Sequence, residues 1–175
     1  MKKTLLIACL LLGSVATFAQ RDLGYRGFVD LGGGIGVTGG SRFTLGLSTV
    51  HGYQAAPFLF VGAGIGVKDM AWKSDWAYGK TENDGWIIPV FGDIRVDVGS
   101  GKFSPFVDMR AGYDFICGNG LYLNPSIGVH YAKSDNFGFN LSAGYEIQGT
   151  DDKLYWKGKE KKSLGFISIK FGIDF

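Results

Sequence analysis

Apolar and polar residues alternate along most of the chain after residue 24. In residues 61–68, for example, aliphatic side chains at the odd positions alternate with three glycines and Lys68. Alternation at every second residue predicts a β-strand whose two faces meet different surroundings. Eight such runs occur, at 25–37, 42–48, 59–68, 90–98, 107–115, 121–131, 139–148 and 167–175. The pattern therefore predicts an all-β protein of about eight strands.

The length of these runs indicates how the strands are arranged. Most approach the ~9–11 residues that cross a bilayer when a strand is tilted. No apolar run beyond the amino-terminal segment reaches the ~20 residues that a membrane helix needs. Backbone groups cannot remain unpaired in lipid, so strands at that depth must close on themselves. We predict a closed antiparallel up-and-down transmembrane β-barrel.

Charged residues occupy the polar face of the predicted strands, which in most strands also carries the glycines. Charges with small residues between them suit an enclosed lumen, and eight strands leave an interior that side chains largely fill. We expect most of these charges to be paired or hydrated, because isolated buried charges are costly. A lumen filled in this way argues against ion flux. The predicted lumen charge network consists of Asp30, Arg42, Asp93, Arg95, Asp97, Asp108, Arg110, Glu146 and Lys170.

Three details of the pattern refine this prediction. Gly92 falls on the apolar face of its run. Pro89 and Pro125 lie in or beside predicted strands, where proline cannot donate to a ladder, so we expect them at bulges or near a rim.

Aromatic residues are expected to form two belts at the ends of the strands. One belt would hold Phe43, Tyr113, Phe115 and Tyr145, and the other Phe103, Tyr131, Phe139, Phe171 and Phe175.

The connections between runs differ in length. Two long polar connections, 69–85 and 149–163, fall on the same side as the short connections 39–41 and 116–120. On the other side the connections 52–57, 99–102 and 133–136 are all short. Outer-membrane barrels carry their longer loops outside, so this asymmetry predicts the orientation. Cys117 would then lie in a short outer loop, as a free thiol without a role.

The two long loops are the predicted interaction surface. Aromatic side chains beside charges can bind carbohydrate, protein or anionic lipid heads, and they can equally anchor a loop at the interface. The lysines of the second loop would be able to contact lipopolysaccharide phosphates. The candidate residues are Trp72, Trp76, Tyr78, Tyr155, Trp156, Lys157, Lys159, Lys161 and Lys162.

The amino terminus has the features of a secretory signal. Lys2 and Lys3 precede an apolar core at 5–12, and the small residues Thr17 and Ala19 fit a cleavage site. We predict a signal peptide at 1–19 and a barrel domain at 20–175. Cleavage removes two of the 18 basic residues, so the remaining chain balances its 16 acidic residues. A neutral chain gives no reason to expect nucleic-acid binding.

Several segments resemble the outer membrane protein beta-barrel domain family, the small OmpA/OmpX-like eight-stranded barrels. Residues 49–54 and 57–62 read TVHGYQ and PFLFVG, similar to a periplasmic turn of that family. Residues 88–95 and 104–113, IPVFGDIR and SPFVDMRAGY, are similar to its strand starts. The carboxy-terminal Phe175 resembles the signal that the barrel-assembly machinery reads. The resemblance covers nearly all of residues 20–175 and implies location and fold more firmly than activity.

Candidate chemistry is sparse. Residues 34–39 match G-x-G-x-x-G, but a strand follows where a dinucleotide site needs a helix. Catalysis by a histidine and a nucleophile would have to use His51 or His130. We expect His51 in a turn and His130 in the lumen, both near the periplasmic end, away from the outer leaflet. We therefore predict no enzymatic activity, no catalytic residue, no cofactor and no metal site.

These features together predict an integral outer-membrane protein of a Gram-negative bacterium, with a structural or surface-interaction role. Its expected partners are outer-membrane lipid, lipopolysaccharide and the barrel-assembly machinery. The sequence does not identify a ligand for the outer loops. One alternative is a soluble periplasmic lipocalin-like barrel, which would turn its apolar face inward. A second is an outer-membrane lipid-modifying enzyme.

Overall fold

A computed structural model describes residues 23–38, 42–73, 81–99, 101–116, 120–134, 137–150 and 162–175. These residues form eight strands: β1 (Gly24–Gly36), β2 (Arg42–Ala56), β3 (Leu59–Lys73), β4 (Thr81–Asp97), β5 (Phe103–Ile116), β6 (Gly120–Ser134), β7 (Phe137–Thr150) and β8 (Lys162–Asp174). Within these ranges, no helix is long and apolar enough to cross a membrane.

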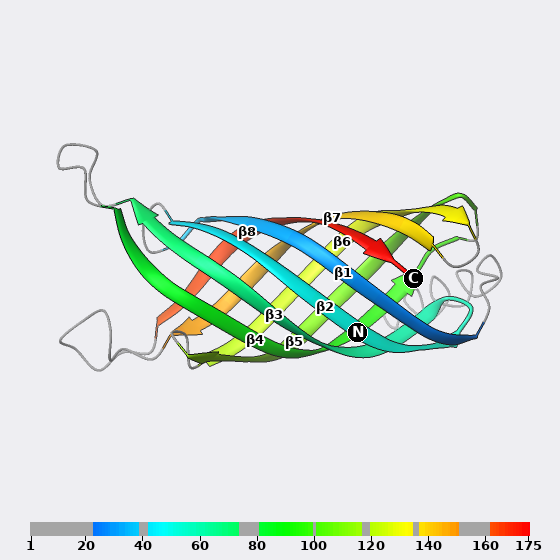
Figure 1. The fold of residues 1–175 in the computed structure, drawn as a ribbon, viewed down its shortest axis with the longest axis horizontal. Helices are drawn as coiled ribbons and strands as arrows, with labels where there is room; N and C mark the ends of the chain where they lie inside the picture. Colours follow the sequence, from blue (N-terminus) through cyan, green and yellow to red (C-terminus); the bar gives the residue numbers. More distant parts are fainter. Residues whose placement is uncertain are drawn as a thin grey trace, which may run out of the picture.

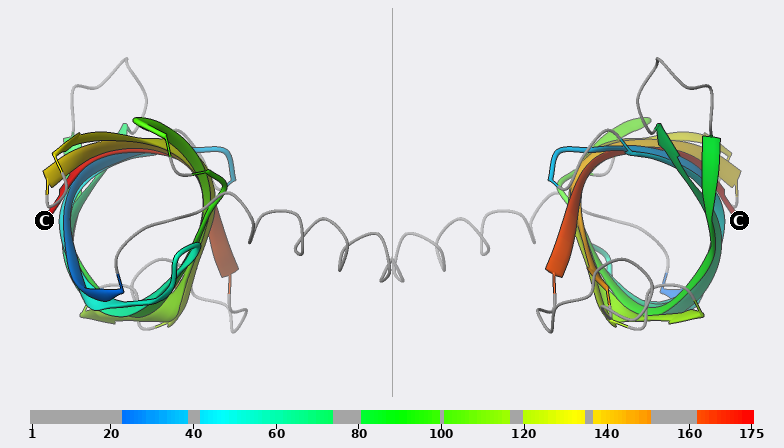
Figure 2. Two further views of the ribbon diagram at one scale, coloured as in Figure 1. Left: turned by 90° about the vertical axis from the view of Figure 1, so that its right-hand side faces the viewer. Right: turned by 90° about the vertical axis from the view of Figure 1, so that its left-hand side faces the viewer.

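The eight strands form one closed antiparallel barrel in the order of the sequence (Figure 1). The pairing of β1 with β8 closes the ring, which is clear when the barrel is viewed along its length (Figure 2). The ladder that starts at Gly24 and passes once around the barrel returns to β1 at Gly34, ten residues further along. A stagger of this size accompanies strands tilted by roughly 35–45°. The predicted closed eight-stranded barrel is confirmed.

The two ends of the barrel differ. At one end, here called the turn end, the short connections 57–58, 98–102 and 135–136 join the strands. At the other, the loop end, the connections are 37–41, 74–80, 117–119 and 151–161. β4 begins at Thr81 but pairs with β5 only from Ile87, so the β3–β4 hairpin projects beyond its neighbours at the loop end (Figure 1).

The two faces of the wall have opposite character. Leu31, Ile35 and Ile127 on the outer face are 52%, 64% and 67% exposed. Arg95 and Arg110 on the inner face are each 1% exposed. The barrel is therefore apolar outside and charged inside, as the alternation predicts. Gly92 also lies on the outer face, as predicted.

The strands extend further than the alternation indicated. β2 continues to Ala56, so the predicted turn at 52–57 is wrong and the turn is 57–58. The predicted loops 69–85 and 149–163 are also too long. In the first, β3 continues to Lys73 and β4 begins at Thr81; in the second, β7 continues to Thr150 and β8 begins at Lys162. β2 keeps its register with β3 up to Gln54, so the error at 52–57 arises because Val50 is apolar on the inner face and His51 is polar on the outer face. A register shift at Met70/Ala71 in the β3–β4 ladder accompanies the error at 69–85. A bulge changes the face on which the following residues lie, so alternation fails as a signal there.

The two prolines also lie elsewhere than expected. Pro89 is inside β4, opposite Asp114 of β5, and Pro125 is inside β6, opposite Met109 of β5. Neither is at a register shift. The ladder between β3 and β4 is interrupted beside Pro89, and the ladder between β6 and β7 beside Pro125, with the same register on both sides of each gap. Each proline therefore removes pairing on one side only, and the expectation of bulges or rim positions was wrong.

Aromatic residues lie near both ends of the outer face. Phe103 and Tyr131 are in contact at the turn end, with ring centroids 4.9 Å apart. Tyr113 and Phe115 are in contact toward the loop end, at 5.3 Å. Phe171 differs from the expectation, because it pairs with Leu31 in the middle of β1.

Candidate functional site

The lumen at the turn end is organised around Arg26 of β1. Its guanidinium donates to Asp97 Oδ2 at 3.0 Å and to Asp174 Oδ2 at 2.8 Å. It also donates to Gln54 Oε1 at 3.1 Å, and His130 Nε2 lies 2.8 Å from Asp174 Oδ2. These side chains come from strands β1, β2, β4, β6 and β8. A single arginine therefore joins opposite walls of the barrel.

A second cluster, around Arg110 of β5, lies deeper in the lumen. Arg110 Nη2 donates to Asp30 Oδ2 at 2.5 Å, and Arg110 Nε lies 3.4 Å from carboxylate oxygens of both Asp93 and Asp108. Lys170 Nζ donates to Asp108 Oδ2 at 3.3 Å, and Ser126 donates to the same oxygen at 3.2 Å. Three carboxylates thus share Arg110 and Lys170 away from water, with Arg95 Nη2 3.9 Å from Asp108 Oδ2, so each charge depends on the others.

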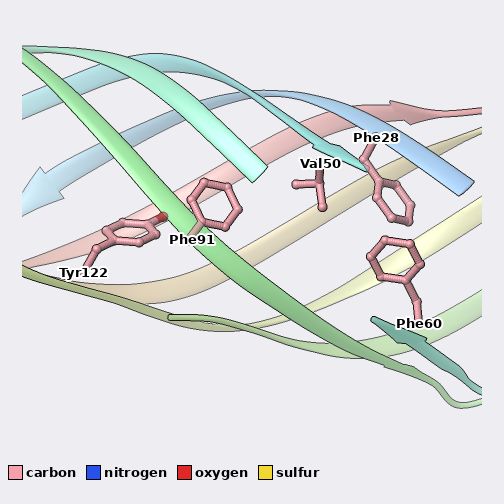
Figure 3. Close-up of a cluster of buried hydrophobic side chains, with 5 residues drawn as sticks. All are labelled: Phe28, Val50, Phe60, Phe91 and Tyr122. Atoms are coloured by element: carbon pink, nitrogen blue, oxygen red, sulfur yellow. The ribbon is translucent and has the colours of Figure 1, made fainter. Parts of the chain in front are cut away.

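Aromatic rings occupy the lumen between and beside these charges, which the sequence analysis did not anticipate. The guanidinium of Arg95 lies between Phe28 and Phe106, 4.0 and 4.2 Å from the ring centroids. Phe28 also meets Phe60 edge to face at 4.9 Å. Figure 3 shows Phe28, Val50 and Phe60 together, with Phe91 and Tyr122 further along the barrel. Cation–π contact adds to the ion pairs in holding the buried guanidinium.

Inner-face glycines make the space that these rings fill. A Cβ atom at Gly62 would lie 2.6 Å from Phe60 Cζ, and one at Gly64 would lie 2.7 Å from Phe91 Cε2. Such separations are closer than any real side chain tolerates, so the rings lie directly over the glycine backbone. The glycine-rich face is therefore a packing surface for aromatic side chains.

The loop end of the lumen holds a third group of polar side chains. Lys68 Nζ lies 2.6 Å from Glu146 Oε1 and 4.4 Å from the Tyr122 ring centroid. Asn124 donates to Glu146 Oε2 at 3.1 Å. Asp114 is fully buried, and neither of its carboxylate oxygens has a hydrogen-bond partner. An apolar cluster of Met70, Ile87, Leu164 and Phe166 lies toward the same end.

The structure places eight of the nine predicted network residues buried on the inner face, and Arg42 half-buried at the start of β2. The lumen also contains Arg26, Lys68, Asp114 and Asp174, which were not assigned to the network. Their even numbers within β1, β3, β5 and β8 put them on the same face as Asp30, Gly66, Asp108 and Lys170. The alternation signal was thus sufficient to find them.

His51 was expected in a turn, which is wrong: it lies within β2 on the outer face. Its Nδ1 is 2.5 Å from the Tyr25 hydroxyl, and its Nε2 is 2.9 Å from Thr49 Oγ1. Thr49 in turn donates to the backbone oxygen of Phe28 at 3.2 Å. His130 is 3% exposed inside the lumen, as expected.

The predicted interaction loops lie mostly outside the described residues. Trp76, Tyr78, Tyr155, Trp156, Lys157, Lys159 and Lys161 are outside them, as is Cys117. Trp72 and Lys162 lie in strands β3 and β8, at the loop end.

No protein-family model matches the chain, and no curated protein matches it. Solved structures do match. A de novo designed transmembrane β-barrel is 15% identical with a TM-score of 0.55, over 90% of this chain and 98% of that one. The outer membrane enzyme PagL is 13% identical with a TM-score of 0.50, over 83% and 97%. Neisserial surface protein A is 13% identical with a TM-score of 0.49, over 87% and 95%.

At these identities the similarity to the designed barrel and to PagL shows the fold alone, that of a transmembrane β-barrel. The narrower OmpA/OmpX-like label is supported by no family model and rests on the sequence motifs alone.

Proposed function

We propose that this chain is an integral outer-membrane β-barrel with a plugged lumen and a structural or surface-interaction role. The observation that carries the proposal is the inverted distribution of side chains. Large apolar residues are exposed around the whole wall, while arginines and carboxylates are buried inside it. In water this arrangement would leave an extensive apolar surface uncovered, whereas in a bilayer that surface faces lipid.

The same observation disfavours the soluble lipocalin-like alternative. A soluble barrel keeps its apolar residues inside, around the ligand. Here Ile127, Ile169 and Leu141 are each more than half exposed, and Asp93 and Asp108 are each 1% exposed. An apolar ligand entering this lumen would have to displace paired charges.

The asymmetry of the ends supports an orientation. Outer-membrane barrels have short periplasmic turns and longer outer loops. The turn end would therefore face the periplasm and the loop end the cell exterior. Export by a signal peptide at 1–19 and recognition of Phe175 by the barrel-assembly machinery belong to this proposal.

The loop end would carry the surface role. The projecting β3–β4 hairpin leads into residues 74–80, with Trp72, Trp76 and Tyr78 in or beside it. The β7–β8 connection carries Lys157, Lys159 and Lys161, and Lys162 begins β8. We propose that these lysines contact lipopolysaccharide phosphates, which lie at the outer surface.

A lipid-modifying activity is less well supported. The similarity to PagL shows the fold alone. His130 lies within the closed lumen, away from any lipid, and His51 is bonded to two hydroxyls at the end proposed to face the periplasm. We propose a non-catalytic role.

Membrane fractionation combined with gel mobility before and after heating tests the main proposal. Recovery in the outer-membrane fraction, with faster migration of the unheated protein, is the expected result. Recovery as a soluble periplasmic protein of unchanged mobility would overturn it.

Replacement of Lys157, Lys159, Lys161 and Lys162 by glutamine tests the surface role. Lipopolysaccharide binding to the folded barrel should weaken, and should weaken less at high salt, where the lysine contribution is already screened. Replacement of Lys102 and Lys133 at the turn end is the matched control and should leave binding unchanged. Unchanged binding in the four-lysine variant would remove lipopolysaccharide as a partner.

A further inference from the structure

The outer face of the barrel carries one polar interruption, on β1 and β2. Between the aromatic residues at the two ends, the described outer-face side chains are otherwise apolar, glycine, proline or tyrosine. His51 and Thr49 are the exceptions. Asp69 is also polar, but it pairs with Trp86 and so lies among the aromatic residues at the loop end, outside this zone. Polar groups facing lipid are costly, so a hydrogen-bonded imidazole in this position marks a candidate site.

The hydrogen bonds of this group form one chain. Thr49 donates to the backbone oxygen of Phe28, so its hydroxyl oxygen is left to accept from His51 Nε2. With Nε2 protonated, Nδ1 is the acceptor, and the Tyr25 hydroxyl donates to it at 2.5 Å. Each N–H and O–H hydrogen of Tyr25, His51 and Thr49 in this series then has an acceptor. The hydroxyl oxygen of Tyr25 can still accept a further hydrogen bond.

The surroundings of Tyr25 are aromatic and accessible. The Tyr25 ring is stacked on His51 with centroids 6.1 Å apart, and Phe175 meets His51 edge to face at 6.4 Å. Tyr25 and Phe175 are 64% and 45% exposed. His51 pairs with Gly27 and Ala63, so its flanks on the outer face carry only a hydrogen and a methyl group.

The position of Gly27 explains how the group is held together. A Cβ atom there would lie 2.7 Å from the Phe175 ring and 3.2 Å from the Tyr25 hydroxyl. The backbone of Gly27 exchanges both hydrogen bonds with Phe175, at 2.8 and 3.0 Å. The two rings therefore converge over a bare stretch of β1, at the turn end and where the barrel closes.

We propose that Tyr25, His51 and Phe175 form a binding site for the primary ammonium headgroup of a phospholipid, of the phosphoethanolamine class. A primary ammonium supplies an N–H that the Tyr25 oxygen can accept. It also supplies a positive charge that aromatic ring faces attract. A choline headgroup offers the charge without the N–H, and a glycerol headgroup offers hydroxyl donors without the positive charge that the rings attract. The site rests on the proposed function, since it requires the turn end to lie in a phospholipid leaflet.

Native mass spectrometry of the full chain in detergent tests this proposal. The folded barrel is mixed with equal amounts of phosphatidylethanolamine, phosphatidylcholine and phosphatidylglycerol of identical acyl chains. Phosphatidylethanolamine should be retained most. Tyr25→Phe keeps the ring and removes the acceptor, and it should lower that preference by roughly five-fold, the equivalent of one hydrogen bond.

The control is Tyr131→Phe, an outer-face tyrosine at the same end on β6, which should keep the preference. Equal retention of the three lipids, or the same preference in Tyr25→Phe as in the unmodified chain, would overturn the proposal. Gel mobility before and after heating is recorded on each sample. A protein that shows no heat-dependent mobility at all would instead refute the membrane barrel itself, and the lipid site with it.

Discussion

Asp30 and Leu31 are neighbours in β1 but belong to opposite sides of the wall. Asp30 is 1% exposed and receives a hydrogen bond from Arg110. Leu31 is 52% exposed and pairs in the ladder with Leu47 and Phe171. The inner residue depends on one named partner across the lumen, whereas the outer residue depends only on being apolar. The inner face should therefore be sensitive to side-chain identity, and the outer face to polarity and depth.

The strongest test of the inner face removes the central cation. Arg110→Met leaves Asp30, Asp93 and Asp108 with only Lys170 and the more distant Arg95. Loss of one partner from a buried charge cluster costs about 3–5 kcal/mol. The free energy of unfolding, from urea titration in lipid vesicles, should fall by that amount. Met109→Leu, the adjacent outer-face position, is the control and should stay within about 1.5 kcal/mol. A loss below about 1 kcal/mol in Arg110→Met would contradict the dependence on partners.

The outer face is tested by a charge placed at two depths. Leu31→Arg, near the middle of the wall, should cost about 2–4 kcal/mol in vesicles, and Phe103→Arg, at the turn end, about 0–1 kcal/mol. The difference arises because Leu31 lies far from the water at either end of the barrel, whereas Phe103 lies close to the water at the turn end. Both values come from the same urea titration. Equal and negligible costs at the two positions would indicate that no lipid covers this face.

A matched pair of glycines compares packing on the two faces. In Gly64→Ala the new methyl would lie 2.7 Å from Phe91 Cε2 and 2.6 Å from the backbone oxygen of Thr49. Overpacking of this kind costs about 1–3 kcal/mol. In Gly92→Ala on the outer face the nearest atom is 3.8 Å away, so the change should stay within about 0.5 kcal/mol. Thermal midpoints of the heat-dependent gel shift would rank the two variants, and equal midpoints would refute the packing role of Gly64.

The two faces also explain what the sequence could and could not predict. Alternation assigned Asp30, Arg110 and Lys170 to one face because a strand has a strict period of two. It failed at Val50 and His51, which are apolar inside and polar outside, and near the register shift at Met70/Ala71 in the β3–β4 ladder. It also places Phe28 on the same face as Asp30, but an aromatic side chain is compatible with either surrounding, so the contact of its ring with Arg95 in the lumen was not predicted.

The pairing within the lumen was beyond sequence reasoning for a different reason. Arg110 and Asp30 are 80 residues apart, and they meet only because the stagger of the barrel brings β1 and β5 to the same level. Likewise the position of His51 on the outer face depends on β2 continuing to Ala56, which the predicted turn concealed. Local patterns fix the face of a residue, whereas its partner depends on the closure of the whole barrel.

The smallest expected effect concerns Asp114, a buried carboxylate on the inner face. Among the described residues, both Asp114 and Asp93 have two carboxylate oxygens without a hydrogen-bond partner, but Asp93 has Arg110 Nε at 3.4 Å, whereas no cation lies within ion-pair distance of Asp114. Asp108, on the same face of β5, interacts with Arg110 and Lys170. Asp114→Asn removes a buried charge that has no cation within ion-pair distance, so it should raise the free energy of unfolding by about 1 kcal/mol. Asp108→Asn removes the carboxylate that pairs with Arg110 and Lys170, so it should lower the free energy of unfolding. If both substitutions lowered stability equally in urea titration, Asp114 would have to be as well paired as Asp108, and the distinction between partnered and unpartnered inner-face charges would fail.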